Sequence, residues 1–402
     1  MLSRRATLAA GLGAGLGSAW APPARAQAAE PLRVWINGDK GYQGIARIGQ
    51  AFQRETGVPV HVEHPEGAVS KFEQAAAAGK GPDIWIWPHD RAGSWAASGL
   101  IRPVAPSRRT VEAISPLAWS AWRLGGRTWA WPIAIESVAL LCNLDLVGQP
   151  PRHWDEVFAL DRRLRAQGRH AIMWPYNEFY YAYGLVSATG GYAFGRRDDG
   201  SWDARDSGVG NAGSRRGLAL LKRLVDEGLV PRTATYAESE AAMNEGRVAM
   251  TINGPWAWNN LRRSRLRVTA APLPAVDGAP GRPMVGVLGA MVAAASRQPV
   301  LAAEFIEHWL ISDAGLLAMH EQAPLGVPAN LALAERLRAQ DPLVAGTLAA
   351  ATLGQPMPNI PEMARYWTAM NAAVQSVTQG RETVDDALAR AARRVDAGGG
   401  AA

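Results

Sequence analysis

The apolar positions of the first hundred residues follow two spacings, one typical of strands and one typical of helices. Residues 32–36 and 83–87 are short apolar runs, and residues 58–63 alternate with period two, so all three predict strands. Residues 42–56 and 69–78 carry apolar side chains at helical spacing. This order predicts a βαβαβ beginning, which is typical of an open α/β sheet.

The second half of the chain repeats this α/β pattern and then becomes mainly helical. Residues 154–167 and 215–227 predict amphipathic helices, and residues 248–252 predict a strand. A length of 402 residues exceeds what one growing core accommodates, so we expect two domains. No short repeat is present, which argues against solenoids and propellers. Further helices are predicted near residues 299–310, 328–340, 342–352, 361–378 and 382–394.

Residues 1–28 are typical of an export signal. Arg4 and Arg5 precede an apolar stretch, and small residues around Ala26 offer a cleavage site. The paired arginines favour the twin-arginine route, with an ordinary secretory signal as the alternative. We therefore expect an exported, periplasmic protein. Beyond this segment no apolar run approaches the roughly 20 residues of a membrane span.

Composition is that of a soluble globular protein, with 48% hydrophobic and 19% charged residues. The net charge of +6 comes from scattered arginines, so we expect no nucleic-acid partner. Cys142 is the only cysteine and lies in an apolar run, which predicts a buried thiol. His61 and His64 lack further ligands at metal spacing, and no phosphate loop or nucleophile elbow is present, so we expect no metal, cofactor or catalytic residue.

Charged groups stand beside aromatic side chains at four places. The first is the strand end Trp35–Tyr42, where an open α/β sheet binds ligands. A cleft of this composition suits a molecule with polar edges and apolar faces, such as a sugar. The residues are Asp39 and Lys40; Trp87 with Asp90 and Arg91; Glu136 after Trp131; and Glu178 with Tyr180.

Most of the 16 tryptophans must belong to the core. Trp119, Trp122, Trp154 and Trp309 lie at helical spacing with other apolar residues, which predicts packing. Trp256 follows an Asn-Gly-Pro turn, and Trp367 lies on a helix after a proline-rich segment. A flat indole can stack on a pyranose ring, so these two are candidate stacking surfaces.

Two other interpretations of the charged residues stay open. Glu136 and Glu178 could form the carboxylate pair of a glycoside hydrolase, because their separation cannot be read from the sequence. Asp90 could simply complement the dipole at a helix start. A structural envelope protein without a ligand is a third possibility.

These residues lie in blocks that resemble the maltose/maltodextrin-binding proteins, the periplasmic partners of bacterial ABC importers. The resemblance runs from about Leu32 to Val395. Its most specific pieces are Trp35–Tyr42, Val62–Pro65, Gly81–Ile84 with Trp87 and His89–Arg91, Pro132–Ala134 with Glu136, Gly190–Phe194, Ala249–Trp258, Val285–Leu288 and Met357–Pro361.

The resemblance implies an α/β, two-domain periplasmic binding protein fold with a multi-strand hinge and a ligand cleft between the domains. It assigns residues 29–134 and 290–336 to an N-terminal lobe, and 139–284 and 343–396 to a C-terminal lobe. The hinge segments would be about 135–138, 285–289 and 337–342.

It also implies a monomeric, non-enzymatic binder of maltose or short α-glucans that meets ABC permease subunits and a chemoreceptor. Another disaccharide, such as trehalose or sucrose, is the alternative ligand. Asp39, Lys40, Asp90, Arg91, Glu136 and Glu178 would bond sugar hydroxyls, Tyr180, Trp256 and Trp367 would stack, and Trp87 would pack at the rim.

The chain departs from the family pocket at four positions. Val69 replaces a sugar-contacting glutamate, Thr368 and Asn371 replace a tyrosine and an arginine, and Tyr181 replaces a phenylalanine. Each charge-assisted bond lost without replacement costs roughly 1.5 to 3 kcal/mol. A loss of this size is enough to change which α-glucoside is preferred, while the sugar class stays the same.

Overall fold

The computed structural model describes residues 29–232 and 234–396, so the predicted export signal lies outside the described residues. Two sheets organise this part of the chain. The larger sheet has the order β14-β6-β13-β3-β1-β2, with β15 beside β13, and the smaller has the order β12-β7-β11-β8. The larger contains β1 (Leu32–Trp35), β2 (Val60–Glu63), β3 (Ile84–Pro88), β6 (Trp131–Ser137), β13 (Met284–Val292), β14 (Val327–Pro328) and β15 (Gln355–Pro356). The smaller contains β7 (Ala139–Asn143), β8 (His170–Ile172), β11 (Val248–Asn253) and β12 (Val268–Ala271).

The predicted βαβαβ beginning is confirmed. Strand β1 pairs in parallel with both β2 and β3, and α1 and α2 form the two crossovers between them. The carboxyl ends of β1 and β3 therefore lie at the same edge of the sheet. This is the edge at which the polar residues after both strands were expected to meet.

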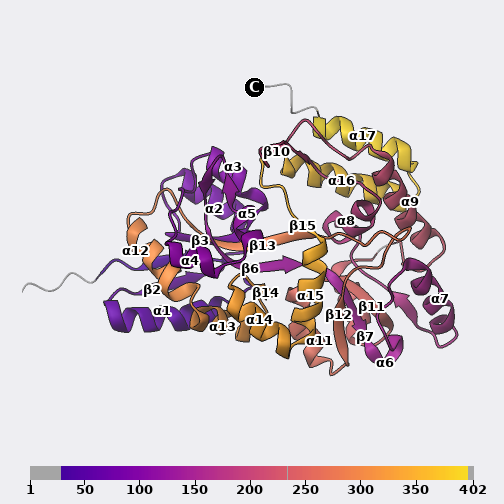
Figure 1. The fold of residues 1–402 in the computed structure, drawn as a ribbon, viewed down its shortest axis with the longest axis horizontal. Helices are drawn as coiled ribbons and strands as arrows, with labels where there is room; N and C mark the ends of the chain where they lie inside the picture. The colour runs from indigo at the N-terminus through magenta and orange to yellow at the C-terminus, as the bar shows by residue number, and fades with distance from the viewer. Residues whose placement is uncertain (1–28, 233, 397–402) are drawn as a thin grey trace, which may run out of the picture.

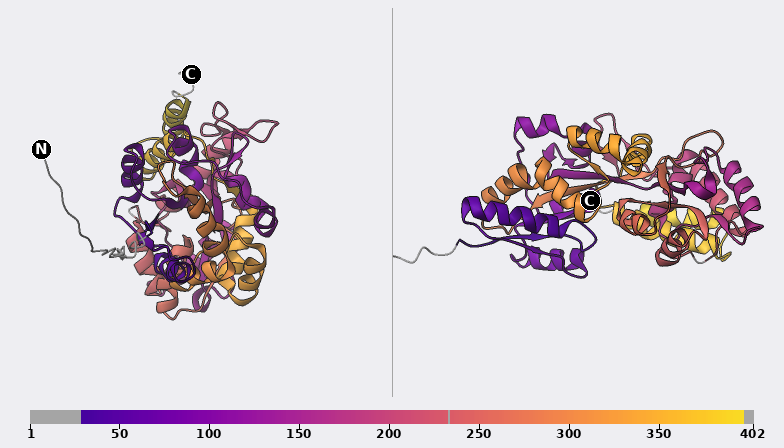
Figure 2. Two further views of the ribbon diagram at one scale, coloured as in Figure 1. Left: turned by 90° about the vertical axis from the view of Figure 1, so that its left-hand side faces the viewer. Right: turned by 90° about the horizontal axis from the view of Figure 1, so that it is seen from below.

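Strands β6 and β13 connect the two halves of the molecule. They pair antiparallel from Val285 opposite Ser137 to Ala290 opposite Trp131, with a register shift between Leu288 and Gly289. In Figure 1 both strands lie between the half with α1 to α5 and the half with α7 to α9, α16 and α17. From below, the two halves lie side by side around a narrower middle (Figure 2). The fold is the expected two-domain α/β arrangement with several strands between the domains.

Helices surround both sheets. In the first half of the chain they are α1 (Tyr42–Thr56), α2 (Ala68–Ala77), α3 (Ala92–Ala97), α4 (Arg108–Ala113), α5 (Pro116–Ala121), α6 (Leu144–Val147), α7 (Trp154–Arg165) and α8 (Phe179–Ala188). In the second half they are α9 (Ala212–Asp226), α10 (Tyr236–Asn244), α11 (Trp258–Arg263), α12 (Pro299–Glu304), α13 (Asp313–Gln322), α14 (Leu331–Gln340), α15 (Pro342–Leu353), α16 (Met363–Thr378) and α17 (Val384–Asp396). The short helices are η1 (His89–Arg91), η2 (Pro255–Ala257) and the π-helix η3 (Phe305–Leu310), and the small hairpins are β4 (Arg123–Leu124) with β5 (Arg127–Thr128) and β9 (Gly195–Arg196) with β10 (Trp202–Asp203).

Several predicted boundaries were wrong by a few residues, and capping side chains explain them. The helix expected from residue 328 begins at Leu331, because Asn330 accepts a bond from Leu333 N at 3.0 Å. The helix expected from residue 215 begins at Ala212, where Asn211 accepts from Ser214 N at 2.8 Å. The helix expected over 299–310 is α12 followed by a π-helical turn.

The buried apolar side chains form two clusters. One surrounds the larger sheet and extends onto the smaller sheet at Leu141, Val248 and Ala270, and the other surrounds β8, β11, α8, α9, α16 and α17. Trp119, Trp122 and Trp154 are buried and Trp309 is half-buried against the first cluster, so the predicted packing tryptophans are confirmed.

Cys142 is fully buried, as predicted, and burial raises the pKa of its thiol to about 12. Among the described residues, no helix is both long enough and apolar enough to cross a membrane.

Candidate functional site

Lys40, in the turn after β1, and Glu136, on the connecting strand β6, form a buried ion pair. Lys40 follows β1 in a turn in which its own N–H donates to Asn37 O at 3.2 Å. Glu136 lies on β6, and the Lys40 Nζ donates to its carboxylate. The two residues are 8% and 3% exposed. Burial lowers the pKa of Lys40, but the attraction of Glu136 and Asp39 outweighs it and leaves the pKa raised.

Three of the predicted aromatic residues come together beside this pair. Tyr180 on α8 has its ring centroid 6.2 Å from Trp256 and 6.2 Å from Trp367. Trp256 lies on η2 and Trp367 on α16, so three separate elements supply the rings. The Lys40 Nζ stands 5.4 Å from the centre of the Trp256 ring. All three rings are half-buried, so each keeps an accessible part.

Asp90, on η1 after β3, lies half-buried near the same aromatic cluster. Burial raises the pKa of its carboxyl to about 6, against the opposing effect of Arg91. The charges of Asp90 and Glu136 both add to the rise in the pKa of Tyr180, whose first cause is burial. The larger sheet thus brings Asp90 close to an aromatic residue whose helix packs in the other core.

Asp39 lines a cavity of about 380 Å³ together with residues of α8, α10, α11 and η2. The other lining residues are Tyr181, Tyr236, Glu240, Trp256 and Asn260. Tyr236, Glu240 and Asn260 escaped the sequence reasoning, because α10 and α11 carry no local pattern that distinguishes them from ordinary surface residues. The only hint in the sequence was the candidate Trp256, which lies two residues before the start of α11.

The remaining predicted residues lie further out. Glu178 is exposed at the start of α8, and Arg91 is exposed on η1. The Arg91 guanidinium lies 3.8 Å from the Glu73 carboxylate. Trp87 stacks on Trp85 with centroids 5.2 Å apart. These three residues surround the cluster of Lys40, Glu136, Tyr180, Trp256 and Trp367 rather than completing it.

The residues that depart from the family pattern have structural partners here. Asn371 accepts a bond from Phe179 N at 2.7 Å and so holds the first turn of α8, which carries Tyr180. Thr368 donates to Ala364 O at 3.1 Å within its own helix. The Tyr181 ring lies 6.2 Å from Trp256, edge to face. Asn371 therefore helps to position Tyr180, and it brings no charged group to the site.

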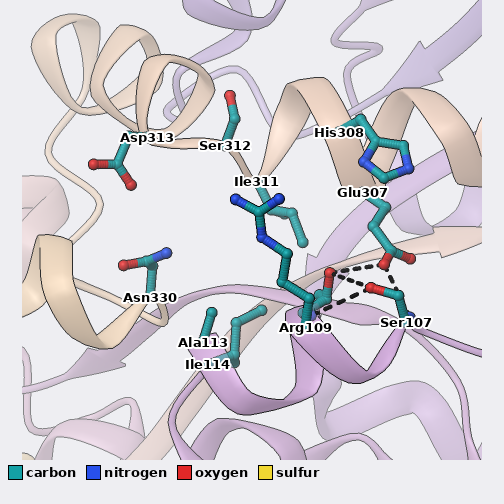
Figure 3. A pocket seen from close by; sticks show the side chains of 11 residues that line it. Ser107, Arg109, Ala113, Ile114, Glu307, His308, Ile311, Ser312, Asp313 and Asn330 are labelled. Carbon is teal, nitrogen blue, oxygen red and sulfur yellow. Dashed lines mark hydrogen bonds between the residues drawn. The ribbon is translucent and has the colours of Figure 1, made fainter.

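A second cavity of about 420 Å³ lies beside the larger sheet, between α4, η3 and the starts of α13 and α14 (Figure 3). Its polar groups are largely engaged within the protein. The Glu307 carboxylate accepts from Ser107 N at 2.9 Å, Thr110 Oγ1 at 2.7 Å and Trp131 Nε1 at 2.9 Å. Ser312 and Asn330 cap α13 and α14. This cavity is lined by no tryptophan, tyrosine or phenylalanine, so the cavity beside Trp256 is the better candidate for a sugar-binding site.

The groove offers the two kinds of group that a polyol requires. Trp256 lines the cavity with Asp39 and Glu240, and the rings of Tyr180 and Trp367 lie beside it; this cavity with the adjoining rings is the groove. The rings present flat apolar surfaces, and the carboxylates of Asp39, Glu240 and the nearby Asp90 can accept hydrogen bonds from hydroxyl groups. Such a pattern leaves few buried polar atoms of a bound sugar unpaired. Within the described ranges, no group of three or more His, Cys, Asp or Glu residues is arranged to hold a metal ion.

The fold is that of a two-domain α/β protein, and Asp39, which follows the first strand, lines one cavity together with Trp256 and residues of α8, α10 and α11. A family model for bacterial extracellular solute-binding proteins matches residues 47–351. The chain therefore belongs to the bacterial extracellular solute-binding proteins, which confirms the resemblance stated from the motifs.

Three curated relatives extend over most of the chain. The chain is 27% identical over 378 residues to the galactooligosaccharide-binding protein of Bacillus subtilis (strain 168), covering 90% of this chain and 87% of the relative. It is 26% identical over 357 residues to the maltodextrin-binding protein of the same organism, covering 84% and 83%. It is 26% identical over 340 residues to the maltotriose-binding protein of Pyrococcus abyssi (strain GE5 / Orsay), covering 82% and 72%.

The buried ion pair gives a test of the site's construction. Replacing Lys40 by Met should lower the free energy of unfolding by about 3 to 5 kcal/mol, because Glu136 would keep a buried charge without its partner. The double variant Lys40→Met with Glu136→Gln should recover part of this loss, since the unpaired charge is gone. Urea unfolding of both single variants and the double variant measures the coupling.

The pH dependence of this contribution follows from the raised pKa of Lys40. A raised folded-state pKa means that the stabilisation is fully present below the ordinary lysine pKa and is lost only as the pH rises through the folded value. Equal unfolding free energies for wild type and Lys40→Met at neutral pH would contradict the proposed role of the pair.

Proposed function

We propose that the protein captures short α-linked glucosides in the groove between its domains and delivers them to an ABC importer. The observation that carries this proposal is the cluster of Tyr180, Trp256 and Trp367, built from three elements and placed against the buried pair Lys40 and Glu136. Stacking surfaces flanked by carboxylates match a pyranose ring with its hydroxyl edge. The relatives, which are galactooligosaccharide-, maltodextrin- and maltotriose-binding proteins, support the same ligand class.

The proposed ligand contacts divide between the two domains. Asp39, Lys40, Trp87, Asp90 and Arg91 would contact the sugar from the first domain. Glu178, Tyr180, Trp256 and Trp367 would do so from the second, together with Tyr236, Glu240 and Asn260. Glu136, on the connecting strand β6, would act through Lys40, whose ammonium group it holds. Only contacts made by both domains favour the closed arrangement, so a sugar that reaches both sets shifts the hinge equilibrium.

Closure would take place about residues 135–138, 285–289 and 337–342. The first two segments pair directly, with Ser137 opposite Val285 and Glu136 opposite Gly286. The third contains the junction of α14 and α15, where Asp341 caps α15 by accepting from Leu343 N at 2.8 Å. Short segments at element ends are suited to absorb the backbone changes of a hinge. The lobes on either side would be residues 29–134 with 290–336, and 139–284 with 343–396.

The environment of Glu136 argues against a glycoside hydrolase. Both members of a hydrolase pair must reach the glycosidic bond or an attacking water. Glu136 is 3% exposed and its carboxylate is held by Lys40, whereas Glu178 is exposed at the start of α8. We propose that the protein binds without catalysis. It would act as a periplasmic monomer exported by the twin-arginine route, with permease subunits and a chemoreceptor as its partners.

Calorimetric titration of the mature protein tests the ligand class. Maltotriose and maltose should bind with one site per chain, while trehalose, sucrose and a galactooligosaccharide serve as competitors of different linkage. The solutions are afterwards assayed for new reducing ends, which should be absent. Absence of heat with every α-glucoside would overturn the proposal, and new reducing ends would favour the hydrolase.

Replacing Trp367 by Ala should weaken maltotriose binding about 10- to 100-fold, because one stacking surface of the groove is lost, and this corresponds to about 1.4 to 2.8 kcal/mol. Trp309→Ala is the matched control, since the ring centroids of Trp309 and Phe52 lie 5.6 Å apart in the cluster around the larger sheet. The control should lower thermal stability but leave the dissociation constant within about twofold of wild type. Equal losses of affinity in both variants would show that stacking at Trp367 is not the cause.

Sugar affinity should fall as the pH decreases through about 6, the folded-state pKa of Asp90. Below this value the carboxyl is protonated and loses its charge-assisted bonds to hydroxyl groups. The same raised pKa means that ionising Asp90 costs folding free energy, so its effect on stability has the opposite sign: stability falls as the pH rises from the ordinary aspartate value through about 6.

Titrations of wild type and Asp90→Asn between about pH 5 and pH 7 measure this dependence. The variant should bind more weakly at neutral pH, and its affinity should change less with pH. An unchanged pH dependence in Asp90→Asn would assign the titration to another carboxyl group, such as Glu178.

A further inference from the structure

The short strand β15 continues the larger sheet beside the connecting strand β13, but their ladder is interrupted after two residue pairs. Met284 lies opposite Gln355 and Val285 opposite Pro356 in parallel pairing. Met357 N then donates to Val285 O at 3.0 Å. In a regular parallel ladder, the next bond would run from Val287 N–H to the Met357 carbonyl.

The His89 imidazole occupies the place of that bond. Val287 N donates to His89 Nδ1 at 3.0 Å, and His89 Nε2 lies 2.8 Å from Met357 O. Since Nδ1 accepts the hydrogen bond from Val287 N–H, the proton of the neutral ring is on Nε2, which donates to the Met357 carbonyl. His89 is fully buried, and burial lowers its pKa to about 4, so the ring stays neutral near pH 7. Both ring nitrogens are thus satisfied by two different chain segments.

These two segments and His89 lead to separate parts of the groove. His89 immediately precedes Asp90 on η1. Val287 lies within the proposed hinge segment of β13, and Met357 begins the approach to α16, which carries Trp367. The imidazole therefore bonds η1 of the first domain both to the hinge segment of β13 and to the segment that leads into α16.

Neighbouring contacts make this junction firm. A side chain at Gly289 would meet the Trp122 ring at 2.4 Å, so the indole lies directly on the backbone of β13. Asn359 Nδ2 donates to Ala121 O at 2.9 Å and to Arg123 O at 3.0 Å. The segment that follows Met357 is consequently held to the first domain before α16 begins.

We propose that His89 is a positioning residue for sugar capture. By bridging β13 and Met357 it fixes the direction of the β13 hinge segment and of the segment that leads into α16, and it holds Asp90 and Trp367 in the relative placement that a sugar needs. The effect on the site is indirect, because the imidazole is buried and both of its hydrogen bonds go to backbone atoms. The role in affinity rests on the proposed function, whereas the role in domain placement does not.

Three substitutions separate the two bonds. His89→Leu removes both. His89→Asn places an amide at the position of Nδ1 and retains an acceptor for Val287 N–H. His89→Gln places an amide at the position of Nε2 and retains a donor for the Met357 carbonyl. His320→Asn is the matched control, because His320 Nδ1 also accepts a backbone bond, from Leu325 N at 3.4 Å, but within the first domain.

Domain placement is measured without sugar, as the distance distribution between spin labels at Val300→Cys and Arg381→Cys. Val300 is 80% exposed on α12, Arg381 is exposed between α16 and α17, and the buried Cys142 does not compete for label. His89→Leu should broaden the distribution and weaken maltotriose binding about tenfold, as expected for the loss of one to two net hydrogen bonds. Asn and Gln should each give a smaller change in both measurements.

An unchanged distance distribution in His89→Leu, or an equal change in His320→Asn, would overturn the proposal. If His89→Leu does not fold, the Asn and Gln variants decide, and wild-type behaviour of both would overturn it. If the wild-type protein binds no sugar, the proposed function fails, and the distance distributions alone still test His89.

Discussion

The antiparallel pairing of β6 with β13 is the contact on which the rest of this molecule depends. Strand β13 contributes Met284 to one hydrophobic cluster and Val285 to the other, so these two strands, with β15 beside them, connect the two clusters. Backbone hydrogen bonds hold the strands in register, so the join is firm along its length. Rotation of the backbone is left to the few residues where the strands leave the sheets.

The same strands bring charge into the middle of the protein. Glu136 on β6 is buried at the join and requires a cation, which Lys40 supplies from the turn after β1. A buried carboxylate without a partner would be strongly unfavourable, so the pair constrains the β1 turn and the connecting strand together. Lys40 also stands over Trp256 and thereby links the first domain to the aromatic cluster of the second.

The departures from the family pocket show how a site can change its residues and keep its shape. Asn371 stands where the resemblance implies an arginine, and its side chain holds the N–H of Phe179 at the start of α8. Tyr180 follows on that helix, so a ligand contact has become a support for one. The edge of Tyr181 packs on Trp256 and extends the aromatic surface toward Tyr236. Residues that a motif comparison counts as losses therefore support or extend the aromatic cluster.

Local sequence determined the elements and their chemistry. The spacing of apolar residues specified the βαβαβ beginning, because side-chain periodicity is a property of each strand and helix alone. It also identified the packing tryptophans and the charged residues at strand ends. The tertiary structure decided which of these residues meet. Lys40 and Glu136 are 96 positions apart, and Tyr236, Glu240 and Asn260 join the groove only because the second domain turns α10 and α11 toward Asp39. His89 looked like one more polar residue after β3, and only the arrangement of β13 and Met357 around it gives its imidazole two backbone partners. Contacts of this kind depend on chain segments brought together by folding, so no periodicity in the sequence could have specified them.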